Sequence, residues 1–360
     1  MKRDLTDMLG MRFGVLTILI CLLGNLKGYA QIGGVGTFDF LNLPSTSRQL
    51  ALGGVNVTSA GVDMDMFWAN PALQNEDMDR QVALNYYSYY ADIGQTSLSY
   101  GQQAGKSGFW RAGMQYIGYG SMDAYDETGA SLGTFQVKDF AFIVSNAHKV
   151  GPFSLGTNLK FAYSGIGDYQ STGLFMDMGG AFIHPDKDLV IGMVFKNIGF
   201  PFSEFSSTQQ FRMPFDSQIG ISFKPEQMPV RLSVTYHHLH EFDIAYDDPS
   251  QDGQIDAFGN EINEDVSFAD KLSRHFVLGG EFVLGKVVNL RFGYNFLRRR
   301  EMVLEGQGGL AGASMGAMLN VRKFRFSYTR AWHHVAGGVN SFSLIADTRS
   351  LFTRKKKVID

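Results

Sequence analysis

After residue 80 the chain repeats one pattern, in which apolar or aromatic side chains occupy every second position and small or polar residues lie between them. The segments 153–163, 288–296 and 324–328 show it most clearly. A period of two predicts a β-strand with one apolar and one polar face. The pattern predicts about fourteen strands, near 80–91, 95–104, 108–119, 134–147, 152–165, 173–184, 188–199, 214–224, 229–241, 273–284, 287–298, 308–319, 322–333 and 338–349.

Soluble β-sandwiches also have alternating strands, so the length of the strands decides between the two classes. Most soluble strands have about five or six residues, whereas about ten tilted residues cross the hydrocarbon core of a bilayer. The polar faces also carry Arg and Lys at mid-strand, which suits a hydrated lumen better than a dry core. We therefore expect an all-β fold, an antiparallel transmembrane β-barrel of about 14 strands with an N-terminal hatch or plug.

The predicted connections alternate between short and long, as short periplasmic turns and long outer loops do in such barrels. The long connections are predicted at 120–133, 166–172, 200–213, 242–272 and 299–307. Exposed aromatic and acidic side chains in them are candidate partner contacts: Phe200, Phe202, Phe205, Phe211, Asp247, Asp248, Asp252 and Asp256.

The N-terminus has the three parts of a secretory signal peptide. Basic residues precede an apolar stretch at 13–23, and Gly28-Tyr29-Ala30 fits a cleavage site near Ala30. We expect residues 1–30 to be removed and the mature chain to lie in the outer membrane. The single cysteine, Cys21, falls inside this segment, which excludes disulfides from the mature chain.

Residues 31–79 do not alternate and are rich in glycine. Asn70 before Pro71 and Ala72 predicts the start of a helix, with proline at its first position. The segment is either a periplasmic tail or a plug. Many inward positions of the predicted strands are small, which favours a hatch at 31–79 inside a barrel at 80–352, followed by a basic periplasmic tail at 353–360.

The inward mid-strand charges are mostly basic. Like charges in a narrow lumen repel each other, so we expect hatch carboxylates to screen them as ion pairs; an anion-attracting lumen is the alternative. The candidates for these pairs are Asp63 and Asp65 in the hatch and Arg111, Lys160, Arg231, Arg291 and Arg325 in the barrel, while Asp177 and Glu281 are the inward acids.

The sequence gives little support for enzymatic chemistry. It contains no His-Glu-x-x-His zinc motif and no phosphate-binding Walker loop. Asp248, Asp252 and Asp256 have part of the spacing of a calcium loop, but Gly259 stands where the bidentate glutamate belongs. Histidines near the outer strand ends could bind zinc, although rim histidines are common. With a formal net charge of −3, nucleic-acid binding is also disfavoured. We expect no catalytic residue, metal or cofactor.

Three N-terminal stretches carry a resemblance: Ile32-Gly-Gly-Val-Gly-Thr-Phe-Asp-Phe-Leu-Asn-Leu-Pro44, Ser47-Arg-Gln-Leu-Ala-Leu-Gly-Gly54 and Trp68-Ala-Asn-Pro-Ala72. With them the chain resembles the PorV/PorQ family of type IX secretion outer-membrane proteins, nearest its PorQ branch, and the related long-chain fatty-acid transporter barrels. Ser47 departs from the alanine usual in the family, and the basic tail is a second departure.

The resemblance implies a non-enzymatic component of a Bacteroidetes-like outer membrane, in contact with membrane lipid and lipopolysaccharide. It implies that the barrel anchors a surface attachment complex for secreted cargo, with PorZ, PorU and PorV as partners. The transporter barrels imply an alternative function, the passage of hydrophobic small molecules.

Overall fold

The structure is a computed structural model that describes residues 36–59, 61, 64–90, 93–205, 212–245, 267–302, 309–334 and 337–349. Several predicted features lie outside these residues: the signal peptide at 1–30, the basic tail at 353–360, Asp63, Phe211, Asp247, Asp248, Asp252 and Asp256.

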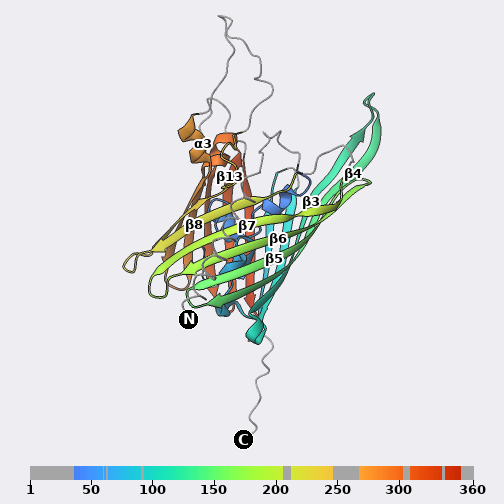
Figure 1. Ribbon diagram of the computed structural model, residues 1–360. Coiled ribbons are helices and arrows are strands. Elements are labelled where there is room, and N and C mark those ends of the chain that lie inside the picture. Colours follow the sequence, from blue (N-terminus) through green and yellow to red (C-terminus); the bar gives the residue numbers. More distant parts are fainter. Residues whose placement is uncertain are drawn as a thin grey trace, which may run out of the picture.

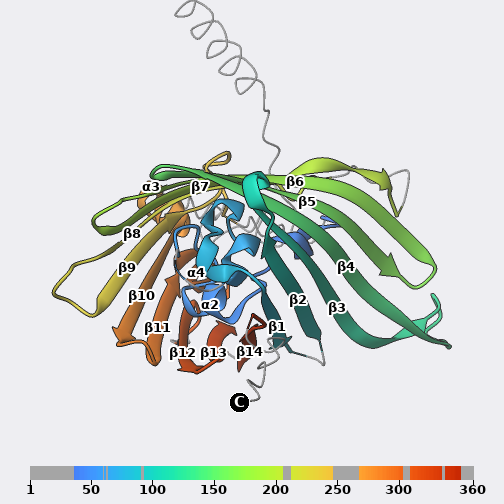
Figure 2. The same ribbon diagram turned by 90° about the horizontal axis from the view of Figure 1, so that it is seen from below.

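The described strands form one closed antiparallel barrel of fourteen, in which each strand pairs with the next and β1 pairs with β14 (Figures 1 and 2). The predicted fold class is confirmed. The strands are β1 Gln81–Ser88, β2 Gly94–Gln103, β3 Phe109–Tyr125, β4 Ser131–Val150, β5 Phe153–Ile166, β6 Tyr169–Ile183, β7 Asp188–Ser203, β8 Asp216–Lys224, β9 Val230–Tyr236, β10 Phe276–Leu284, β11 Val288–Asn295, β12 Ala313–Val321, β13 Phe324–His334 and β14 Gly337–Asp347.

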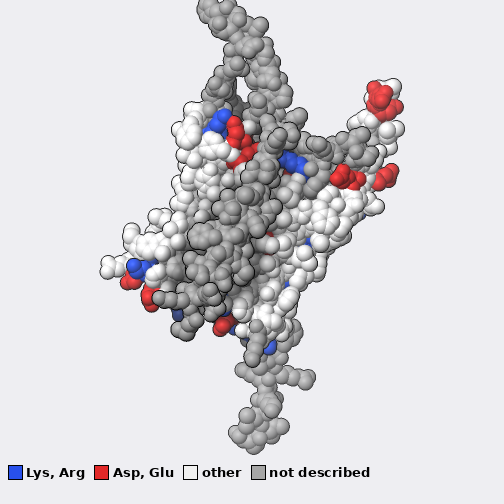
Figure 3. Space-filling view, viewed as in Figure 1, with Lys and Arg blue, Asp and Glu red and all other residues white. Residues whose placement is uncertain are grey.

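Burial follows the sequence alternation along the strands. In β5, Ser154 and Asn158 are buried toward the lumen, whereas Leu155 and Leu159 are exposed on the outer surface. The charged residues drawn in Figure 3 gather toward the upper and lower edges of the described surface, with a mostly uncharged band between them. Such a band is what the hydrocarbon core requires. Among the described residues, no helix is long and apolar enough to cross a membrane.

The outer ends of several strands differ from the prediction. The predicted loop at 120–133 is largely a β-ribbon, because β3 and β4 stay paired from Ser121↔Gln136 out to Tyr125↔Ser131 (Figure 1). Gly, Ser and Thr in this stretch hide the strand pattern, since the ribbon projects past the membrane and needs no apolar face. β9 ends at Tyr236, five residues before the predicted end at 241. Two short outer helices, α3 Phe268–Arg274 and α4 Phe296–Glu301, begin where a loop and a strand end were predicted.

The described residues before β1, which are 36–59, 61 and 64–80, lie inside the barrel, as Figure 2 shows from below. Their elements are the 3-10 helices η1 Asp39–Asn42, η2 Met64–Trp68, η3 Pro71–Leu73 and η4 Glu76–Met78 and the α-helix α2 Ser47–Ala51. A further 3-10 turn, η5 Gly105–Ser107, connects β2 to β3. Helix α2 contacts β11 to β14, while η3 contacts β4 to β6 on another part of the wall. We call residues 36–80 the hatch.

Inward glycines provide the space in which the hatch backbone sits. A Cβ built on Gly156 would lie 2.4 Å from the carbonyl carbon of Pro71, and one on Gly179 would lie 2.1 Å from Oδ1 of Asn70. At Gly293 it would lie 2.1 Å from the backbone nitrogen of Gly53. The hatch and the wall are therefore fitted to each other at backbone level.

We predict that Gly179→Val displaces η3 from the wall, because the new side chain overlaps Asn70. Overpacking of this kind costs about 1–3 kcal/mol. Limited proteolysis of the refolded barrel in detergent should cut the hatch of this variant faster than that of the parent. Gly180→Val is the matched control, because Gly180 faces outward and its nearest neighbour, Leu155, leaves 3.7 Å to the added Cβ. Equal cleavage of both variants would contradict the prediction.

Candidate functional site: the hatch and the barrel wall

A buried carboxylate holds the hatch to the wall. Glu281 on β10 is 2% exposed and accepts two hydrogen bonds from Arg48 in α2, one from Nε at 3.1 Å and one from Nη2 at 2.8 Å. Arg291, directly opposite on β11, donates from Nε at 2.9 Å, and Arg231 on β9 donates from Nη1 at 3.1 Å. Bidentate Arg–carboxylate pairs combine strength with fixed geometry. This cluster therefore orients α2 in the lumen.

In the Glu281 cluster the hatch provides a cation and the wall provides the anion, whereas the prediction placed the carboxylates in the hatch. Arg48 belongs to the hatch, and Arg231 and Arg291 of the wall donate to the same carboxylate, Glu281. The physical reason is the register of β9, β10 and β11, which places Glu281 beside both arginines.

Lys160 also pairs with a wall residue. Its Nζ lies 2.7 Å from Oδ2 of Asp177 on the adjacent strand and donates to Oδ1 of Asn197 at 2.7 Å. Asp177 accepts in addition from the backbone N–H of Asn197 at 2.9 Å. This buried network contacts the hatch through Asn197, whose side-chain amide donates to Oδ1 of Asn42 at 2.8 Å. It also contacts the hatch through Asn158, whose Nδ2 lies 2.8 Å from Oδ2 of Asp177 and 3.1 Å from the carbonyl oxygen of Phe67.

Arg111 contacts the hatch directly. Its Nε donates to Oε1 of Gln74 at 3.0 Å, and its guanidinium lies 5.8 Å from the ring centre of Phe67. Asp65 is buried beside β1 and β2, where it accepts from Nδ2 of Asn85 at 3.1 Å and from Oγ of Ser99 at 2.9 Å. Arg325 lies nearer the periplasmic end of the barrel, where it lines a cavity of about 300 Å³ together with Asp77, Gln81 and Arg349.

The Asn70-Pro71-Ala72 motif forms the predicted helix start. Oδ1 of Asn70 accepts from the backbone N–H of Ala72 at 3.0 Å, with Pro71 at the first position of η3. Nδ2 of Asn70 donates to the carbonyl of Val57 at 3.1 Å and to that of Gly180 at 3.3 Å. One fully buried side chain thus caps η3 and ties it to both the hatch and β6.

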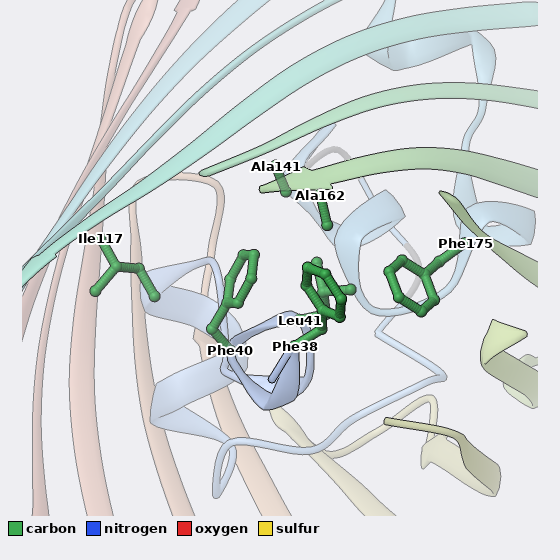
Figure 4. Packing of buried hydrophobic residues seen from close by; sticks show 7 residues of the cluster. All are labelled: Phe38, Phe40, Leu41, Ile117, Ala141, Ala162 and Phe175. Atoms are coloured by element: carbon green, nitrogen blue, oxygen red, sulfur yellow. The ribbon is translucent and has the colours of Figure 1, made fainter. Parts of the chain in front are cut away.

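The outer part of the lumen contains an apolar cluster that sequence reasoning missed. Phe38, Phe40 and Leu41 of the hatch pack against the wall, where the buried partners are Ile117, Ala141, Ala162 and Phe175 (Figure 4). The rings of Phe38 and Phe175 meet edge to face at 5.1 Å. A sequence signal existed, because Ile117, Ala141 and Phe175 occupy inward strand positions that are otherwise mostly polar.

The wall is irregular next to this cluster. Between Met176 and Met178 the β6–β7 register shifts, and Asn197 on β7 adopts a left-handed conformation with φ of 57°. Two residues of β7 face one of β6 there, which is a β-bulge. The hatch binds at this point, since Asn42 contacts Asn197 and donates to the carbonyl of Pro214 at 2.9 Å.

The predicted loop aromatics occupy different environments. Phe200 and Phe202 lie on β7 and not in a loop; both face outward, more than half exposed, with ring centres 5.4 Å apart. Phe205 follows the strand and is half-buried. These positions bring the first two into the upper part of the barrel's outer surface.

Neither a nucleophile-like sequence motif nor the acidic and histidine side chains of the described residues form a site for chemistry. Gly312-Ala-Ser314-Met-Gly316 has the spacing of a hydrolase nucleophile motif, but Ser314 lies on β12 and its Oγ donates to the carbonyl of Ala51 at 3.0 Å. Ser314 therefore serves as a seat for α2. Within the described ranges, no group of three or more His, Cys, Asp or Glu side chains is placed to hold a metal ion.

Comparisons with known proteins agree with the barrel. Residues 27–174, less than half of the chain, match the Uncharacterised protein family (UPF0164). No curated protein matches. The structure of a TodX monoaromatic hydrocarbon channel deltaS2 mutant is similar with a TM-score of 0.53 and 11% identity, covering 84% of this chain and 98% of that chain. This likeness shows a shared outer-membrane barrel fold.

Two further solved structures are similar at lower scores. The toluene transporter TodX of Pseudomonas putida has a TM-score of 0.49 and 11% identity, with 85% of this chain and 99% of that chain covered. A FadL homologue of Pseudomonas aeruginosa has a TM-score of 0.46 and 10% identity, with 84% and 98% covered.

We predict that Arg48→Met lowers the free energy of unfolding by about 3 kcal/mol, because removing one partner leaves the buried Glu281 incompletely paired. Two arginines remain on the carboxylate, which keeps the loss at the lower end of the range for buried pairs. Urea unfolding in detergent, followed by tryptophan fluorescence, measures it. The control is Arg80→Met, whose partner Asp79 lies 3.7 Å away at an exposed site, for which we expect less than about 1 kcal/mol. Equal losses would contradict the anchoring role of Arg48.

Proposed function

We propose that this protein is an outer-membrane channel for hydrophobic small molecules whose ligand path is occupied, in this conformation, by residues 38–43 of the hatch. The observation that carries the proposal is the apolar cluster of Phe38, Phe40 and Leu41 against the wall. Ligand sites for such molecules are apolar concavities with a few polar groups at defined places.

The apolar wall residues of this cluster are not expected in a lumen that is filled only with water, where inward side chains are polar. Elsewhere the inward strand positions carry Ser, Asn, Gln and charged side chains, as in β5 and β8. Burying one Phe or Leu side chain contributes about 1.5–3 kcal/mol. A hydrophobic ligand that takes the place of these hatch side chains makes equivalent contacts, so the exchange is nearly balanced in free energy.

The hatch is held unequally along its length. The four-residue helix η1 is held to the wall by apolar contacts and by two hydrogen bonds of the Asn42 side-chain amide group. Helix α2 is held by the Arg48–Glu281 pair and by Ser47, whose Oγ lies 2.9 Å from Oγ1 of Thr329. We therefore propose that the segment around η1 moves while α2 stays in place.

The β7 bulge lies at the same site as the movable segment. Bulges interrupt the ladder and redirect side chains, and they recur beside functional sites. Asn197 joins the bulge, Lys160 and Asn42, so release of Asn42 changes the hydrogen bonding of the wall at that point. One similar solved structure is a monoaromatic hydrocarbon channel, which agrees with an apolar ligand.

The test is to cross-link the hatch at two places and measure toluene uptake into cells that carry the protein. In a Cys21→Ser background, Asn42→Cys with Asn197→Cys, joined by a short bis-thiol reagent that is cleavable by reduction, locks the segment around η1. We expect at least a tenfold loss of uptake, restored on reduction, because a blocked conformation cannot bind ligand.

The matched control is Ser47→Cys with Ser343→Cys, which joins α2 to β14 at a contact of 3.1 Å. Uptake should be unchanged by this link, since α2 does not need to move. Uptake that survives the first link, or that does not exceed the level in cells lacking the protein, would overturn the proposal.

A second candidate function is the anchoring of a type IX attachment complex, favoured by the projecting β3–β4 ribbon. Pairing of β3 to β2 ends at Gly118 and that of β4 to β5 ends at Val137, so beyond these points the two strands pair with each other. The tip carries Asp123, Asp126 and Glu127. The pKa of Asp126 is lowered, mainly because its carboxylate accepts a hydrogen bond from the Thr128 hydroxyl and further ones from backbone N–H groups. Such an acidic ribbon offers two strand edges to a surface protein.

The expected outcome for this candidate is binding of purified PorZ to the detergent-solubilised barrel, weakened about tenfold by Asp123→Asn, Asp126→Asn and Glu127→Gln together. Asp168→Asn with Glu204→Gln, elsewhere on the outer rim, is the control. Absence of PorZ binding to the parent protein, measured by biolayer interferometry, would exclude this partner and leave the channel proposal untouched.

A further inference from the structure

The outer surface of the barrel has an apolar groove of about 520 Å³ over β1 and β11 to β14. Its lining includes outward side chains in two rows, one of Leu84, Leu319, Phe326 and Leu344 and one of Tyr86, Ala317, Tyr328 and Phe342. The volume falls within the range of small-molecule sites.

Ala317 makes the groove. It lies opposite Leu290 on β11 and Tyr328 on β13, both large, so the small side chain leaves a depression between two ridges. On the second ridge, the rings of Tyr328 and Phe342 pack with their centres 5.0 Å apart. The depression faces the acyl chains of the bilayer and is therefore filled by apolar matter.

Two basic turns lie below this groove. Val288 and Leu319 of the lining pair with each other near the ends of the turns at 285–287 and 321–323. The turns lie close together, since Nδ2 of Asn320, at the end of β12 next to the second turn, donates to the carbonyl of Lys286 at 3.2 Å. They contain Lys286, Arg322 and Lys323 and no acidic residue. Arg322 and Lys323 also line the adjoining cavity, where two acids, Asp77 and Asp347, lie with two further arginines, Arg325 and Arg349. Basic residues therefore outnumber acidic ones at the periplasmic end of the groove.

We propose that this groove is a binding site for an anionic phospholipid of the periplasmic leaflet. One acyl chain lies in the depression over Ala317, and the phosphate lies at Lys286, Arg322 and Lys323. Basic clusters at the membrane surface attract anionic headgroups, each Lys or Arg adding appreciably to the affinity. The apolar depression favours binding of an acyl chain, and the basic turns favour a negatively charged headgroup.

A second copy of the protein fits the same surface less well. Two copies related by a two-fold axis along the membrane normal would bring their basic turns toward each other. Like charges at such an interface repel, whereas a phosphate lowers the local charge. Charge complementarity therefore favours the lipid.

The test is native mass spectrometry of the full mature chain in detergent, titrated with phosphatidylglycerol and, separately, with phosphatidylethanolamine. We expect phosphatidylglycerol to bind at least about tenfold more tightly. Lys286→Gln, Arg322→Gln and Lys323→Gln together should remove this preference. The matched control is the triple variant Lys149→Gln, Lys187→Gln and Lys224→Gln, which removes the same number of charges from other periplasmic strand ends. This control should retain the preference for phosphatidylglycerol.

The apolar half of the site is tested by Ala317→Phe, which fills the depression and should weaken both lipids about tenfold. Ala112→Phe places the same side chain on the lipid-facing side of β3 and should have no effect. Equal binding of the two lipids, or equal behaviour of each variant and its control, would overturn the proposal. Lipid-free dimers that Ala317→Phe abolishes would overturn it as well, in favour of a second copy.

Discussion

The arrangement inside the barrel depends on the need to satisfy the polar side chains that face inward once the hatch has displaced water. Glu281 is the centre of this requirement, because three arginines meet at one buried carboxylate and one of them, Arg48, belongs to the hatch. A buried charge without partners is costly. The cluster therefore has all three of its arginines only when α2 is seated in the lumen.

This requirement divides the hatch into two parts. The part around α2 and η3 is joined to the wall by charge, by side-chain caps and by the glycine seats at Gly156, Gly179 and Gly293. The part around η1 is joined mainly by the burial of apolar side chains. Apolar contact is not directional, so another apolar molecule can replace it, whereas the ion-pair geometry of Arg48 and Glu281 cannot be substituted in this way.

Much of the fold could be predicted from the sequence, because period-two alternation is a local property that lipid on one side and polar groups on the other impose on each strand. The β3–β4 ribbon was missed for the same reason, since beyond the membrane its strands need no apolar face. In the site, the cations of the wall were found, but their partners depend on register. Glu281 lies opposite Arg231 and Arg291 only after the strands are aligned, and Arg48 reaches it from 233 positions away in the sequence.

The contacts of α2 also constrain how the protein is assembled. The hatch precedes β1 in the chain, yet α2 packs against β11 to β14, the last strands to be synthesised. The seam between β1 and β14 therefore closes around a segment that is covalently attached to β1 and bound to the strands approaching it. Closure of the barrel and seating of α2 therefore draw on the same strands, because β14 both pairs with β1 and contacts α2.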